Sequence, residues 1–311
     1  MNPPGHGAVP AVPPGGRSVR RAPEPALGNV SVVRGGSALT QVVAAPAAIT
    51  RPPALIAVAH GSRDPRSAAT MRDVVERIAA QRPDLDVRLA FLDLSTPSVD
   101  QVIDAVAADG HSHAVVVPLL LGNAFHARVD LPGLLDAARD RHPRLRLTQA
   151  EVLGPDPHLI IALRDRIAAA MAIGSDPRPA AVTDAATGRL RRMTGPRWGI
   201  AVAAVGSSSA AANTRTGDVA RLLTAMTGWD TEICFATTQP TVDKAFARLR
   251  ARGAERILVA PWFLAPGLLT DRLRDALPLV RHADTIGAHP LLAEVALDRY
   301  ATAALPLELT A

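Results

Sequence analysis

The stretch Ala54-Leu-Ile-Ala-Val-Ala-His60-Gly-Ser-Arg-Asp-Pro65 decides the fold of this chain. Its first six residues are all apolar, which is typical of a strand buried on both faces of a parallel sheet. Asp64 and Pro65 then predict the start of a helix, because aspartate caps free N–H groups and proline fits the first helical position. The stretch therefore predicts a strand, a loop that carries His60, and a helix, which is the repeating unit of α/β proteins.

The same alternation continues through the first half of the chain. We expect strands near 85–94, 114–121 and 145–150, and helices near 97–110, 127–141 and 157–172. Residues 174–197 are rich in Pro, Gly, Thr and Arg. Their apolar residues follow neither the helical nor the strand periodicity, so we expect a linker. Residues 1–50 are rich in Pro and Gly without a repeat, and we expect a disordered tail there.

After the linker the order of elements returns, which indicates an internal repeat. Pro97 and Pro240 stand 143 residues apart, and each opens a matching helix. Strands that alternate with helices favour parallel sheets. We therefore expect an α/β protein with two similar domains, 51–173 and 198–311, which face each other across a cleft.

The two domains are expected to differ in their histidines. His60 and His126 each follow an apolar run in the first domain. The repeat aligns His60 with Val205 and His126 with Leu269, so neither histidine has a counterpart in the second domain. Any chemistry is therefore expected in the first domain.

Polar residues follow the predicted strands where such sheets bind ligands. His60 and His126 could meet at this edge, and paired imidazoles bind divalent metals and accept protons near neutral pH. A histidine at position 60 could equally cap the next helix or bond a loop carbonyl. Asp93 ends the second strand and is either a proton acceptor or a solvated loop residue. Gly61 and Ser62 offer backbone N–H groups that suit an anion.

Composition excludes several classes of function. The net charge of +5 is spread along the chain without an aromatic-interleaved basic stripe, so we expect no nucleic-acid partner. The sequence contains no run of about 18 apolar residues, so we expect no membrane span. Cys234 is the only cysteine, which excludes an intrachain disulfide and favours a reducing cytoplasm.

Three motifs in order resemble the sirohydrochlorin chelatase family, the CbiX/SirB-type class II chelatases. These are His60-Gly-Ser-Arg-Asp-Pro65, Phe91-Leu-Asp-Leu-Ser-Thr-Pro97, and Pro118-Leu-Leu-Leu with His126 eight residues after the proline. The likeness covers about residues 54–305 apart from the linker. It implies a chelatase-like fold and insertion of Fe²⁺ or Co²⁺ into sirohydrochlorin, in sirohaem or cobalamin biosynthesis.

The resemblance also implies roles for individual residues. His60 and His126 would be the metal-binding and proton-accepting pair, while Asp93 stands where relatives often have a glutamate. The family's substrate bears many carboxylates, which Arg63, Arg66 and Arg128 could hold, although all three are equally well explained as solvated helix residues. The metal is then a substrate, and no tightly bound cofactor is expected.

Two other functions compete with the chelatase. A non-catalytic carrier of a tetrapyrrole or a metal would share the cleft, and a hydrolase could use the Gly-Ser loop for a phosphate. The sequence does not choose between iron and cobalt. Because the duplication supplies both walls of a cleft within one chain, we expect that a monomer suffices.

Overall fold

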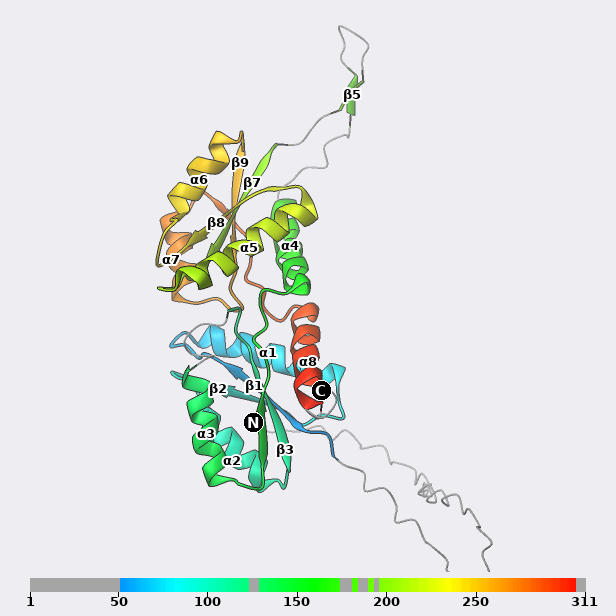
Figure 1. The fold of residues 1–311 in the computed structure, drawn as a ribbon. Helices are drawn as coiled ribbons and strands as arrows, with labels where there is room; N and C mark the ends of the chain where they lie inside the picture. Colours follow the sequence, from blue (N-terminus) through cyan, green and yellow to red (C-terminus); the bar gives the residue numbers. More distant parts are fainter. Residues whose placement is uncertain (1–50, 123–128, 174–180, 184–189, 193–195, 306–311) are drawn as a thin grey trace, which may run out of the picture. The chain divides into compact units, whose positions relative to one another are not determined.

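The computed structural model describes residues 51–122, 129–173, 181–183, 190–192 and 196–305, and the structural statements below refer to these residues. They contain two four-stranded parallel sheets flanked by helices (Figure 1). The elements of the first half are β1 (Ala54–Ala59), α1 (Pro65–Gln81), β2 (Val87–Phe91), α2 (Val99–Ala108), β3 (His113–Pro118), α3 (Leu131–Arg141), β4 (Arg146–Gln149) and α4 (Pro157–Ala172).

The second half repeats this series. Its elements are β7 (Trp198–Ala204), α5 (Ala210–Thr227), β8 (Asp230–Phe235), α6 (Val242–Ala251), β9 (Arg256–Pro261), α7 (Leu268–Ala276), β10 (Arg281–His282) and α8 (Pro290–Ala304). The α/β class and the repeat expected from the sequence are confirmed. The segment between the halves adds a short antiparallel pair, β5 (Ala181–Thr183) and β6 (Leu190–Arg192), which its composition did not predict.

The two sheets have the same topology. Their strand orders are β2-β1-β3-β4 and β10-β9-β7-β8, so β7 takes the place of β1 and β9 that of β3. β1 pairs in parallel with β2 on one side and β3 on the other, and all six of its residues are buried. The chain leaves β1 toward β2 and then crosses to β3, so the carboxyl ends of β1 and β3 flank a switch point, where open α/β sheets bind ligands.

The terminal helices of the two halves are exchanged. α4 packs on α5 and β9 of the second half, whereas α8 packs on α1, β3 and β4 of the first (Figure 1). Two arginines 133 residues apart make matching bonds across this exchange. Arg166 on α4 donates to Ile286 O at 3.1 and 2.7 Å, and Arg299 on α8 donates to Val152 O at 3.1 Å and Leu153 O at 3.4 Å.

The exchange gives the halves a common core. One cluster of buried side chains contains Leu55 and Val115 from the first sheet and Ile200 and Leu258 from the second, joined by residues of α4 and α8. Separate clusters cover the outer face of each sheet. None of the helices in the described part of the chain is long and apolar enough to cross a membrane.

Candidate functional site

A cavity of about 1270 Å³ lies between the two halves, at the carboxyl ends of their central strands. The first half contributes the residues after β1 and β3, and the second half contributes those after β7 and β9. This volume exceeds what drug-sized ligands commonly fill. The cavity is therefore large enough for a macrocyclic ligand.

His60 is the first residue after β1, and its half-buried side chain lines this cavity. Its Nδ1 lies 3.2 Å from Gly61 O, a carbonyl that can only accept. In the neutral ring this contact favours the tautomer that carries its proton on Nδ1 and its lone pair on Nε2. Of the two alternative roles for His60, capping of the next helix is wrong, because Asp64 is the N-cap of α1, whereas the contact with a loop carbonyl is present.

Gly61 allows the His60 loop to touch the neighbouring loop. Its φ of 91° lies in the region that favours glycine. A Cβ built at this position would lie 1.7 Å from Asp93 O, far inside contact distance. The main chain of Asp93 is held there by a 3.0 Å bond from its N–H to His60 O. No other residue fits this position without moving the loop.

Serine hydroxyls fix the remainder of the loop. Ser62 N–H donates to Ser95 Oγ at 3.2 Å, and that hydroxyl donates to Ser62 O at 3.0 Å. Asp64 N–H donates to Ser62 Oγ at 3.0 Å. The backbone around His60 is therefore fixed from both sides before a ligand arrives.

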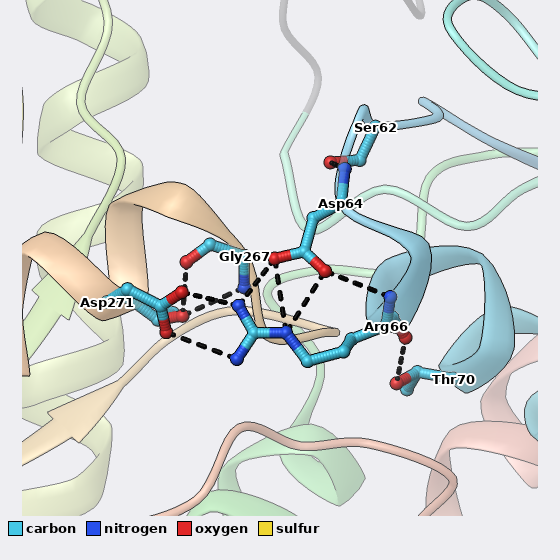
Figure 2. A network of polar contacts seen from close by, with 7 residues as sticks. Ser62, Asp64, Arg66, Thr70, Gly267 and Asp271 are labelled. Carbon is cyan, nitrogen blue, oxygen red and sulfur yellow. Dashed lines mark hydrogen bonds and ion pairs between the residues drawn. The ribbon is translucent and has the colours of Figure 1, made fainter.

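Arg66 ties the two halves together beside this loop. Figure 2 shows its guanidinium between the carboxylates of Asp64, at the start of α1, and Asp271, on α7. Hydrogen bonds from Arg66 hold the pKa of Asp64 below its usual value, and the bonds to both carboxylates raise the pKa of Arg66. Arg66 is thus compensated within the protein, and it does not line the cavity.

The structure brings together some of the predicted site residues. His60, Gly61 and Ser62 line the cavity. Asp93 and Arg63 are exposed and do not line it, and the Asp93 carboxylate accepts the N–H of Leu94 at 2.7 Å.

His126 and Arg128 lie outside the described residues, so the pairing of the two histidines stays a prediction.

Two further histidines, His111 and His113, lie at the amino end of β3, whereas His60 follows the carboxyl end of β1. His111 is buried, and its Nε2 lies 2.8 Å from Asp86 Oδ2. His113 opens β3 and bonds Thr148 Oγ1 at 3.0 Å. Burial lowers the pKa of His113. Neither histidine lines the cavity, although Thr148, the partner of His113, does.

The second half supplies lining residues that the sequence did not assign to a site. Val205 follows β7 as His60 follows β1, and Gly206 repeats the positive φ of Gly61, at 95°. Arg215 on α5 and Leu268 on α7 also line the cavity. The spacing of the repeat predicts that Val205 follows its strand as His60 follows β1. It does not predict a role for the Val205 side chain.

Arginines dominate the charge of the cavity wall. Arg146, Arg215 and Arg299 line it, whereas Glu151 is the single carboxylate among the described lining residues. A positively charged cavity wall favours a ligand that carries carboxylates. In the described part of the chain, no three His, Cys, Asp or Glu side chains cluster as metal ligands.

Known proteins resemble this chain over both halves. The family model CbiX matches residues 54–170 and 199–303. A sirohydrochlorin cobaltochelatase of Priestia megaterium is 26% identical over 257 residues, covering 78% of this chain and 77% of that protein. A sirohydrochlorin ferrochelatase of Bacillus subtilis (strain 168) is 26% identical over 258 residues, covering 79% of this chain and 90% of that protein.

A solved structure supports the same fold. SirB from Bacillus subtilis with Fe³⁺ superposes with a TM-score of 0.65 and covers 83% of this chain and 98% of its own. The sequence identity is 24%, so this likeness concerns the architecture alone.

Proposed function

Because the chain belongs to the CbiX family, we propose that it inserts a divalent metal ion, Fe²⁺ or Co²⁺, into sirohydrochlorin. The observation that carries this function is the arginine-lined cavity of about 1270 Å³ with His60 in its wall. The relatives named for cobalt and for iron match at the same identity, 26%, and the reaction is common to both.

The reaction needs a proton acceptor and a weak metal ligand. A free-base tetrapyrrole loses two pyrrole protons as a divalent cation enters, so the products are the metallated macrocycle and two protons. The lone pair on His60 Nε2 can hold the cation or take one of these protons. Imidazole nitrogen suits borderline ions such as Fe²⁺ and Co²⁺.

We assign His126 as the second member of the pair and keep the other predicted roles as proposals. The N–H of Gly61 and the hydroxyl of Ser62 are candidate donors to a carboxylate of the substrate, since the N–H of Ser62 is already bonded to Ser95 Oγ. Arg63 and Arg128 are candidate partners for the carboxylates of the substrate, and Asp93 is a candidate proton acceptor through a change of its side-chain rotamer.

The structural organisation supports a single active site in each chain. The region 51–173 carries the histidines, 198–311 forms the opposite wall, and 174–197 links them, so a monomer holds a complete cavity. A cytoplasmic location fits the single cysteine, Cys234.

One assay tests this function. Purified protein is mixed anaerobically with excess sirohydrochlorin and either Fe²⁺ or Co²⁺, and the absorbance of the macrocycle is followed. We expect many turnovers per protein, with an initial rate proportional to protein concentration. Stoichiometric binding without acceleration would instead identify a carrier and reject the enzyme.

A further inference from the structure

The second half faces the same cavity as His60 but lacks the chemistry of the first. Val205 occupies the position of His60, 145 residues later, and lines the opposite wall. The loop geometry has been kept, since Gly206 has a φ of 95° against 91° for Gly61. What differs is the side chain that the loop presents, an isopropyl group in place of an imidazole.

This wall is apolar and exposed inside the cavity. Val205 is 43% exposed and Leu268 is 60% exposed, and both line the cavity together with Leu264 and Leu269. Large apolar side chains left open in a concave site mark a ligand surface. The apolar face of a flat macrocycle can pack against these side chains.

The second half also contributes a positively charged side chain to the cavity. Arg215 on α5 lines the cavity and is exposed, and no described residue bonds its guanidinium. Arg299 differs, because its guanidinium is bonded to Asp156 at 2.9 Å and to the carbonyls before α4. Arg215 is therefore the cation of this half that is available to a carboxylate of a ligand.

We propose that the second half binds the macrocycle and that the first half performs the chemistry. Val205 and Leu268 cover one face of the ring, Arg215 pairs with a peripheral carboxylate, and the opposite face is turned to His60. The metal then enters from one face only. This assignment of roles rests on the proposed function, and it gives the half that has no counterpart of His60 a positioning role.

The test compares three variants with two matched controls. Val205→Asn and Leu268→Asn remove apolar contact, and Arg215→Gln removes the charge. Leu279→Asn changes a leucine that is 99% exposed and does not line the cavity. Arg221→Gln changes an exposed arginine elsewhere on α5, which is paired with Asp218. The measurements are the dissociation constant of metal-free sirohydrochlorin, KM, kcat and the melting temperature.

We expect the three cavity variants to raise the dissociation constant and KM for sirohydrochlorin about tenfold, with kcat nearly unchanged. The effect of Arg215→Gln shrinks at high salt, because the interaction it removes is screened. The controls behave like the wild type.

Unchanged dissociation constants in all three cavity variants would overturn the proposal even if the wild type inserts metal. A fall of kcat alone would overturn it too, since it would place these residues in the chemical step. A wild type that binds sirohydrochlorin but never turns over would reject the proposed function, and the binding titration would still decide the role of the wall.

Discussion

Gly61 is the residue on which the geometry of the His60 loop depends. Its positive φ and the 1.7 Å approach of a virtual Cβ to Asp93 O leave no room for a side chain. The loop after β1 and the loop after β2 are in contact only because this position is glycine. His60 takes its place at the cavity wall from that contact.

Gly61→Ala is expected to destabilise the protein and to reduce metal insertion. The strained backbone alone contributes about 1–3 kcal/mol, and the displaced Asp93 carbonyl adds to it. The melting temperature and the initial rate measure the two effects. Gly133→Ala is the control, because Gly133 lies within α3 with open space around it, and alanine there should be neutral or stabilising. Equal behaviour of the two variants would contradict this account of the loop.

For single residues, the sequence predicted the position of the backbone better than the rotamer of the side chain. His60 lines the cavity because a strand end fixes its backbone. Asp93 also ends up beside the loop, but its carboxylate turns to the N–H of Leu94. A side-chain rotamer depends on local bonds that a strand-and-helix pattern does not contain.

The exchange of α4 and α8 is the main feature at the scale of elements. Each helix covers the sheet of the other half, and the matching arginines Arg166 and Arg299 bond carbonyls just before the helix of the opposite half. Arg299 also bonds Asp156, the N-cap of α4. Of the two helices, α8 contributes Arg299, Thr302 and Ala303 to the cavity wall.

Arg299→Ala is expected to lower the free energy of unfolding by about 1–3 kcal/mol, because Val152 O, Leu153 O and Asp156 lose a charged donor. Chemical denaturation measures the change. Arg272→Ala removes an exposed arginine from α7 and should stay close to the wild type. If the two variants were equally stable, the bonds across the exchange would contribute nothing.

The sequence predicted these helices but not their exchange. Periodicity identifies the buried face of a helix, and α4 begins and ends where the sequence pattern predicts. It does not say which of two similar sheets the face will cover. The repeat made the two sheets nearly equivalent partners, so only the three-dimensional contacts distinguish them.

At the scale of the whole molecule, the common core joins the halves into one folding unit. Buried residues of both sheets belong to the same cluster, with α4 and α8 between them. The two halves defined by the sequence repeat therefore do not have separate hydrophobic cores.

The two halves are expected to unfold together. All three tryptophans, Trp198, Trp229 and Trp262, belong to the second half, so their fluorescence reports on that half, whereas far-ultraviolet circular dichroism reports on both. Denaturation curves from the two probes should coincide. A fluorescence transition clearly separated from the dichroism transition would contradict a common core.

The central claim is that metal insertion depends on His60, and its most direct measurement is the anaerobic insertion rate of His60→Ala. We predict a fall in kcat of at least about 100-fold, with the melting temperature and sirohydrochlorin affinity retained. His142→Ala, which changes a histidine at the far end of α3, should keep the wild-type rate. A His60→Ala protein that inserts Fe²⁺ or Co²⁺ as fast as the wild type would contradict the account.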